Sequence, residues 1–418
     1  MPSSCARNIE RHFLSTDEIL RDSTTSTYAK SPCTDYQSYI PDSLHPEFLP
    51  KRYVRVRFFI VRHDEHDRQF DIDTGTAFIK ALLESGNNKL RQNEKMVLPI
   101  GNQTPKLPIQ YEYVLYQNPN DPNDNGVKVI IDSSLAYFNK KSSTNGFYDK
   151  KLIDKYGIPN DSVYNLFILE HHPDSTQSKT YNTSMDGVGF STWGKIVNYY
   201  SYRDKVKSIG DSLYFDPNEI VPTLMNHEFG HSFGLSHSWS GDGCDDTPNH
   251  PNCWDQFSDS CKETGIFSNN MMDYNNRQIA LTPCQIGKIH LGFSRDNGTS
   301  RKLLLPLWCE YKPEAAIVIP SFEDIEWNGA RDFESDIIIQ NNASLTIRCR
   351  VALPQGAKII IKPKGKLIID GGYITNICNG QWEGIEIWAN GDNRGEVVIK
   401  NGGKLEKMKQ EPTKGKSK

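Results

Sequence analysis

Three histidines, one glutamate and one glycine within eleven residues constrain the fold of this chain more than any other feature. The run from His227 to His237 has the pattern HExxHxxGxxH, in which Glu228 is the glutamate and Gly234 the glycine. Residues four apart on a helix share a face, so the first two histidines can present their imidazoles to one ion. Glycine adopts the left-handed conformation without penalty, so Gly234 can end the helix and let His237 turn back as a third ligand.

The same spacing predicts a catalytic metal site. His227, His231 and His237 would hold zinc and leave its fourth position open for water. Zinc lowers the pKa of such a water from about 15.7 to near 7, and Glu228 can take its proton during attack on a peptide carbonyl. The alternative, that these are ordinary surface or core histidines, is disfavoured because the motif falls on a predicted helix with a glycine stop.

Residues 51–300 are predicted to form one domain with a mixed sheet and packed helices. Apolar, β-branched runs predict strands, and apolar periodicity of a helical kind predicts helices. The expected strands are 53–61, 109–115, 127–131 and 163–169, and the expected helices are 76–90, 222–233 and 283–291. Gly86 should break the first helix, and Pro222 should occupy the first turn of the second. An irregular, cysteine-rich segment follows.

From residue 313 to residue 405 the sequence consists of short β-rich repeats. Residues 336–347 align with residues 358–369 at an offset of 22, and a third copy lies at 396–405. Repeats of this length, with a Gly/Asn turn between two β runs, are typical of a β-solenoid or a small β-sandwich. One end of such a stack should be uncapped after Leu405, and residues 406–418 should form a solvated basic tail.

Charge and composition exclude several classes of partner. The net charge of −4 disfavours nucleic-acid binding, which requires a clustered basic excess. No apolar stretch approaches the roughly 18 residues of a membrane-spanning helix. Residues 1–50, rich in Ser, Thr, Asp and Pro, should be an extended N-terminal segment or pro-segment without a secretory signal. Nine cysteines nevertheless indicate an oxidising compartment, so we expect a secreted or cell-surface protein whose export signal has been removed.

A methionine-containing segment, SNNMMDY at 268–274, follows the histidine motif. The histidine motif with a later Met turn resembles the metzincins. Within them, CDDTP at 244–248 together with NMMDY at 270–274 resembles the pappalysin family. The specific resemblance covers residues 227–274, a looser one extends back to residue 53, and neither covers the repeats. It implies an α+β metzincin-like catalytic domain with a twisted mixed sheet, an active-site helix and an irregular disulfide-bearing subdomain. Such a domain would act as a zinc-dependent endopeptidase on proteins or peptides.

The resemblance also assigns roles to single residues. Met272 would form the hydrophobic floor beneath the zinc, although it could equally be ordinary core. Tyr274 would hydrogen-bond the developing oxyanion, with a purely structural tyrosine as the alternative. A glycine-rich run would be the edge strand along which an extended substrate binds, or else a plain loop. This run consists of Gly187, Val188, Gly189 and Phe190.

In the pappalysin family, two disulfides and structural calcium lie in the subdomain after the histidine motif. The implied disulfides here are Cys244–Cys261 and Cys253–Cys284, although four cysteines allow three pairings. The implied calcium ligands are Asp245, Asp246 and Thr247, whose hard oxygens suit this ion. A solvated acidic loop explains these three residues nearly as well.

The sequence leaves latency open. Some metzincins are held latent by a pro-segment cysteine that caps the zinc, and Cys5 and Cys33 are the candidates here. A disulfide between these two cysteines is the favoured alternative. In the repeats, Cys349 and Cys378 could be bridged across rungs.

A second candidate function belongs to a different class. The chain could be a surface adhesion or carbohydrate-binding protein that acts through residues 313–405 and carries a vestigial metal site. The intact Glu228 favours the endopeptidase, because a vestigial site has no need of a base. A composite, in which the repeats anchor the protease to glycans or a surface, is also compatible with the sequence.

Overall fold

The computed structural model describes residues 9–22, 32–65, 71–138, 149–159, 162–171, 187–198, 217–250, 268–274 and 278–409. Its contacts divide the chain into two compact units. The motif unit, which contains the histidine motif, comprises residues 40–43 and 51–305, and the repeat unit comprises residues 1–39, 44–50 and 306–418. Among the described residues, no helix has the length and apolarity needed to cross a membrane.

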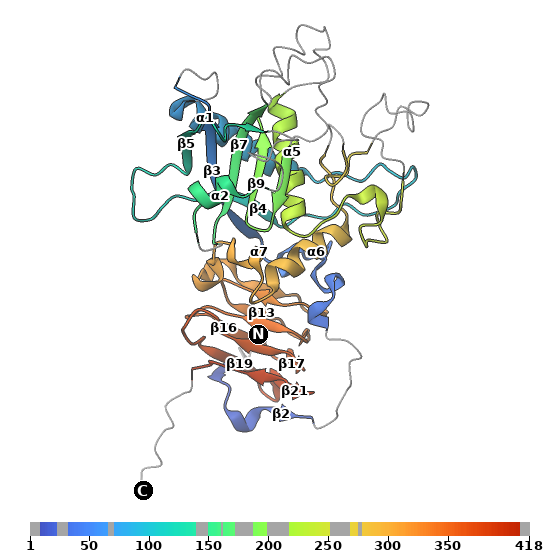
Figure 1. Cartoon of the computed structure of the whole chain (residues 1–418). Coiled ribbons are helices and arrows are strands. Elements are labelled where there is room, and N and C mark those ends of the chain that lie inside the picture. The colour runs from blue at the N-terminus through green and yellow to red at the C-terminus, as the bar shows by residue number, and fades with distance from the viewer. Residues whose placement is uncertain are drawn as a thin grey trace, which may run out of the picture. The chain divides into compact units, whose positions relative to one another are not determined.

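A twisted sheet forms the centre of the motif unit (Figure 1). Its strand order is β4-β3-β7-β9-β8, and β5 and β6 pair with β3 and β7. All pairs are parallel except β8 with β9, so the sheet is mixed, and the strand at the β8 edge runs against its neighbour. The strands are β3 (Arg52–Arg62), β4 (Tyr111–Leu115), β5 (Val127–Ile131), β6 (Tyr137–Phe138), β7 (Tyr164–His171), β8 (Gly187–Phe190) and β9 (Trp193–Val197).

The central strands are apolar runs because both faces of the sheet are covered. Every residue of β7 and of β9 is buried. The sequence predicted β3, β4, β5 and β7 close to their observed bounds, whereas β6 and β9 were missed. β9 contains Gly194 and a fully buried Lys195, which hide its strand character from a search for alternating apolar residues.

Two long helices, α1 (Ile72–Gln92) and α5 (Pro217–Ser232), pack against each other. The prediction that Gly86 breaks the first helix is wrong, because α1 runs through it. A Cβ atom at Gly86 would lie 2.3 Å from Met225 Cε of α5, so glycine serves close helix packing here. Pro222 lies inside α5 and not in its first turn, which corrects the second expectation. The other helices among the described residues of this unit are α2 (Lys151–Tyr156), α6 (Pro283–Ser294), α7 (Thr299–Lys302) and a 3-10 turn at Ser238–Ser240.

In the repeat unit, successive repeats add strands to the same three sheets, and the strands of neighbouring repeats pair in parallel (Figure 1). The first sheet holds β10 (Ile317–Ile319), β13 (Ile337–Ile339), β16 (Lys358–Ile361) and β19 (Gly384–Asn390), with β20 (Asn393–Arg394) on its margin. The second holds β11 (Asp324–Trp327), β14 (Ser344–Ile347), β17 (Lys366–Asp370) and β21 (Glu396–Lys400). The third holds β12 (Arg331–Asp332), β15 (Arg350–Ala352), β18 (Tyr373–Thr375) and β22 (Lys404–Leu405).

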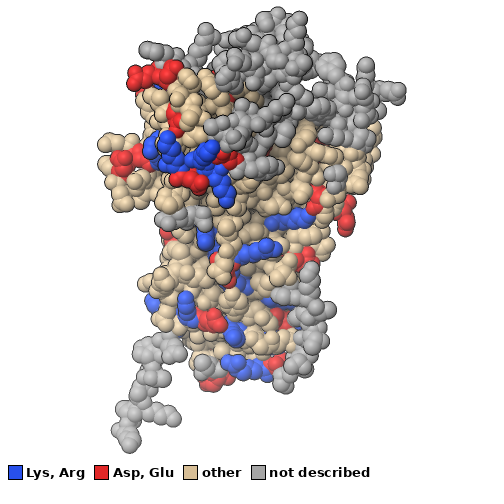
Figure 2. Space-filling view, in the orientation of Figure 1, with Lys and Arg blue, Asp and Glu red and all other residues tan. Residues whose placement is uncertain are grey.

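The predicted offset of 22 residues reappears as strand register. Ile337 pairs with Ile359 and Leu345 with Leu367, and their side chains enter a continuous apolar core. The outer face carries ion pairs between neighbouring rungs, such as Lys358 with Glu386 at 2.6 Å. Figure 2 shows basic and acidic side chains interspersed over the face in view.

The N-terminal residues are part of the repeat unit. β1 (Glu10–Phe13) pairs with β19, and β2 (Leu20–Arg21) pairs with β21, so two of the three sheets do not end at the last repeat. The expectation of an uncapped end is therefore wrong for these two sheets. The described parts of residues 1–39 and 44–50 are folded into the repeat unit, whereas the sequence predicted an extended segment. Their short 3-10 helices are Thr16–Glu18, Pro32–Thr34, Tyr36–Tyr39 and Pro46–Phe48, and two more, Leu307–Cys309 and Pro313–Ala315, precede the first repeat.

Disulfides correct two predictions in this unit. Cys33 is bonded to Cys349, not to Cys5, which lies outside the described residues. Cys378 is bonded to Cys309, not to Cys349. The sequence could not give these pairs, because each joins positions that become neighbours only when the repeats stack.

Candidate metal centre

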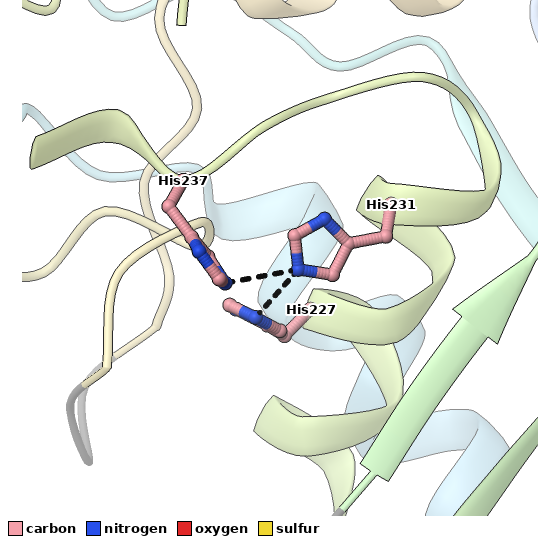
Figure 3. Close-up of side chains that lie close together, drawn as sticks. All are labelled: His227, His231 and His237. Atoms are coloured by element: carbon pink, nitrogen blue, oxygen red, sulfur yellow. Dashed lines mark hydrogen bonds between the residues drawn. The ribbon is translucent and has the colours of Figure 1, made fainter. Parts of the chain in front are cut away.

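Helix α5 and the turn after it bring the three motif histidines together. His227 and His231 lie one turn apart on α5, and Gly234, with φ of +92°, reverses the chain after the helix. The Nε2 atom of His231 lies 3.1 Å from that of His227 and 3.1 Å from that of His237 (Figure 3). The three imidazoles therefore converge on one point, as the sequence predicted.

Hydrogen bonds to the rings of His227 and His231 fix which ring nitrogen carries the proton. Nδ1 of His227 donates to the carbonyl of Met271 at 2.8 Å, and Nδ1 of His231 donates to that of Leu235 at 2.9 Å. Each bond places the proton on Nδ1 and leaves a lone pair on Nε2. Burial lowers the pKa of all three histidines, that of His237 to about 4, so the rings are neutral at pH 7.

Three convergent lone pairs fit a shared divalent cation. A tetrahedral zinc with Zn–N bonds of about 2.0–2.1 Å sets its ligand nitrogens about 3.3–3.4 Å apart, close to the separations found here. Neutral imidazole nitrogens are the ligand type that zinc accepts. Cys244, Asp246 and Cys284 form the second candidate metal group among the described residues. The two cysteines are bonded to each other, so they offer no thiolate.

Glu228 lies on α5 directly beneath strand β8, with 5% of its surface exposed. A Cβ atom at Gly187 would lie 2.6 Å from Glu228 Oε1, and one at Gly189 would lie 1.9 Å from the Glu228 carbonyl oxygen. The two glycines therefore allow β8 to rest on the helix at the glutamate. Since β9 is the one strand partner of β8 among the described residues, the other side of β8 is an edge of the sheet.

The Met turn, residues 268–274, also packs against α5. Met272 is fully buried, and a Cβ atom at Gly230 would lie 2.2 Å from its sulfur. Gly230 lies on the helix between the two histidine ligands, so Met272 packs next to them. The carbonyl of the preceding Met271 is the one that accepts the His227 hydrogen bond.

Tyr274 stands beside the histidines and is 36% exposed. Its ring centroid lies 4.7 Å from that of His237 and 5.9 Å from that of His227. Burial, together with the nearby charge of Glu228, raises the pKa of Tyr274, so its phenol keeps its proton at neutral pH. Sequence reasoning missed Trp239, which stacks on His237 at 4.3 Å, although an aromatic residue so close to the motif was a usable signal.

The three predicted calcium residues make different contacts. Asp245 is exposed, whereas Asp246 accepts a hydrogen bond from the backbone of Cys284 at 2.9 Å, and Thr247 donates to Asp242 at 2.6 Å. Asp246 Oδ1 is buried without a hydrogen-bond partner among the described residues. Burial raises the pKa of Asp242, a residue that sequence reasoning did not select.

The disulfide of this subdomain differs from the prediction. Cys244 is bonded to Cys284, which rules out both Cys244–Cys261 and Cys253–Cys284. Cys253 and Cys261 lie outside the described residues. The backbone hydrogen bond from Cys284 to Asp246 holds the loop against the start of α6, which places residue 244 beside residue 284.

One family model covers the residues of this site. Residues 204–293 match the Peptidase_M43 family, described as pregnancy-associated plasma protein-A. Among solved structures, the chain is similar to mature mirolysin of Tannerella forsythia in complex with a cleaved peptide, at 17% identity and a TM-score of 0.38, over 60% of this chain and 95% of that one. Mirolysin in complex with compound 9 (17%, 0.37, 61% and 96%) and a promirolysin mutant (17%, 0.38, 61% and 84%) are similar too. The comparison with curated proteins found no match.

Proposed function

We propose that this chain, which carries a metallopeptidase domain of the pappalysin type, is a zinc-dependent endopeptidase that hydrolyses proteins or peptides. The observation that carries the proposal is the convergence of three neutral imidazoles, with Nε2 separations of 3.1 Å, beside a buried glutamate. Convergent imidazoles alone would suit a structural site. The adjacent carboxylate adds a base, which only a hydrolytic site requires.

His227, His231 and His237 would hold the zinc. When bound, zinc supplies a Lewis acid and lowers the pKa of water toward about 7. Glu228 takes one proton from the attacking water at its carboxylate and delivers it to the amine that leaves when the peptide bond breaks. Tyr274, protonated at neutral pH, donates a hydrogen bond to the oxyanion that develops on the peptide carbonyl.

Substrate would bind along β8 in extended form. The outer side of an edge strand presents backbone N–H and C=O groups that can pair with an added strand. Because Gly187 and Gly189 bring β8 onto Glu228, a peptide paired with β8 would run past the base. Main-chain pairing is independent of side chains, so it suits a peptidase that cleaves within a chain.

Zinc is the cofactor of this proposal, and calcium at Asp245, Asp246 and Thr247 is a secondary part of it. The buried, unpartnered Oδ1 of Asp246 supports calcium there.

We also propose secretion, since the described residues hold three disulfides, which persist in oxidising compartments. The three parallel sheets of the repeat unit support its assignment as a β-solenoid. Glycan or surface anchoring by this unit stays a prediction.

A cleavage-site profile on a peptide library tests the proposal. The zinc-loaded full chain should cleave internal peptide bonds, and a chelator should abolish cleavage until zinc is restored. Glu228→Ala should lower kcat by at least about 100-fold, because it removes the base, while zinc content and melting temperature stay at the wild-type values. Cleavage that survives the chelator, or full activity in Glu228→Ala, contradicts the proposal.

The alternative function is tested with the same variant. If the chain is an adhesion or carbohydrate-binding protein, the wild type should cleave no peptide in the library. Glycan-array binding by the full-length Glu228→Ala protein then decides whether the repeat unit anchors the chain. Binding together with cleavage would indicate the composite.

A further inference from the structure

A buried carboxylate outside the catalytic set lies behind the third histidine. The side chain of Asp273 is 1% exposed, and Ser238, the residue after His237, donates a hydrogen bond to its Oδ1 at 2.5 Å. Ser268 donates to Oδ2 of the same carboxylate, and Nε2 of His250 lies 3.2 Å from that oxygen. Asp273 thus links the Met turn, residues 268–274, to the loop that contains His237.

The three histidines are held in different ways. Nδ1 of His227 and Nδ1 of His231 each bond to a carbonyl oxygen, which fixes the orientation of the ring. Within the described part of the chain, Nδ1 of His237 makes no such bond, and its ring is positioned by stacking on Trp239 at 4.3 Å. His237 also lies beyond the end of α5, at the N-cap of the 3-10 turn Ser238–Ser240, and the backbone N–H of Ser238 donates to the carbonyl of Met272 at 3.4 Å.

We infer that Ser238 and Asp273 are the positioning residues of the third metal ligand. The inference rests on the proposed function, because it assumes that His237 binds zinc. The hydrogen bond from Ser238 to Asp273 fixes the backbone next to His237 and holds the imidazole at the distance the other two require. The carboxylate does this from the Met turn, which itself packs on α5 through Met272 and accepts the His227 hydrogen bond through Met271.

Burial makes this link rigid. Ser238 and Asp273 are both fully buried, so water cannot replace the hydroxyl when it is removed. Loss of a partner that orients a metal ligand typically weakens metal binding by about 10–100-fold. Loss of this hydrogen bond should lower zinc affinity without unfolding the protein. The link spans one loop, and α5 and the sheet are held by other contacts.

The test compares two serines that donate to the same carboxylate. Ser238→Ala removes the donor on the ligand loop, and Ser268→Ala removes the donor on the Met turn. Zinc affinity is measured for both full-length variants by competition with a fluorescent chelator of known affinity, and the melting temperature of each metal-free protein is recorded. Ser238→Ala should bind zinc about 10–100-fold more weakly, and Ser268→Ala should stay within about threefold of wild type. Ser238→Thr, which keeps the hydroxyl, should recover most of the affinity.

Each other result overturns the inference. Equal zinc affinity in wild type and Ser238→Ala would show that the link does not position His237. Equal losses in the two alanine variants would assign the effect to the whole buried cluster, and a metal-free Ser238→Ala protein that does not fold would assign it to stability. A wild type that binds no zinc would refute the proposed function itself, which separates the two failures.

Discussion

At the scale of single residues, the motif predicted the convergence of three imidazoles because that convergence depends on local geometry. Four-residue spacing on a helix and one glycine suffice to bring His227, His231 and His237 together, and both are visible in the sequence. Asp273 and Trp239, which lie beside the histidines, were found only in the structure. Asp273 reaches Ser238 across 35 positions, and Trp239 stacks on a ring whose orientation depends on a turn.

Gly187 gives the sharpest prediction at this scale. Its φ is not in the left-handed region, so alanine is tolerated by the backbone, and the new Cβ would lie 2.6 Å from Glu228 Oε1. Gly187→Ala should therefore displace the carboxylate and lower kcat by at least about tenfold, since a well-placed base contributes about 100-fold or more. Zinc content should be unchanged. The measurement is steady-state kinetics on a peptide that the wild type cleaves.

Val188→Ala is the matched control for that experiment. Val188 neighbours Gly187 in β8 and pairs with Lys195, and alternation along the strand points its side chain away from the Glu228 side. This variant should keep kcat within about twofold of wild type. If Gly187→Ala also keeps its kcat, the close contact between β8 and Glu228 has no part in catalysis.

At the scale of elements, hydrophobic pattern located the strands better than it located the helix boundaries. The β-branched runs of β3, β5 and β7 were visible because strand pairing rewards them directly. Gly86 and Pro222 misled the prediction, because local propensity disfavours both inside a helix while packing between α1 and α5 overrides it. The contact between Gly86 and Met225 is the physical reason.

Gly86→Val tests that reason. The added side chain would press into Met225 and Asn226 of α5, and overpacking of this kind costs about 1–3 kcal/mol. The melting temperature of the motif unit should fall by several degrees, since each kcal/mol shifts Tm by about 2–4 °C in a domain of this size. Ala77→Val, at an exposed position of the same helix, controls for the helix propensity of valine. Equal melting temperatures in the two variants would refute the packing explanation.

At the scale of the whole molecule, the sequence predicted a β-rich repeat region after the domain with the histidine motif, but not which residues belong to each unit. Short β-rich repeats begin near residue 313, and their 22-residue offset appears as strand register. The assignment of N-terminal residues to the repeat unit was hidden, because β1 and β2 are short and pair with strands almost 380 residues away. Disulfide partners were hidden for the same reason, since sequence distance carries no information about them.

Removing the Cys33–Cys349 bond tests the placement of the N-terminal residues. A variant with Cys33→Ser and Cys349→Ser should destabilise the repeat unit by about 2–5 kcal/mol, the usual range for a native disulfide. Calorimetry should show a lower melting transition for this unit, while zinc content and cleavage at 25 °C stay near wild type. An unchanged transition would mean that the N-terminal residues are not tied to the repeats.

The central claim is that one zinc ion is held by three imidazoles and no other protein group. Anomalous diffraction at the zinc absorption edge, on crystals of the zinc-loaded full chain, tests it most directly. The account predicts a single strong peak within bonding distance of the Nε2 atoms of His227, His231 and His237, with no fourth protein ligand. A peak elsewhere, or one that excludes His237, would contradict it.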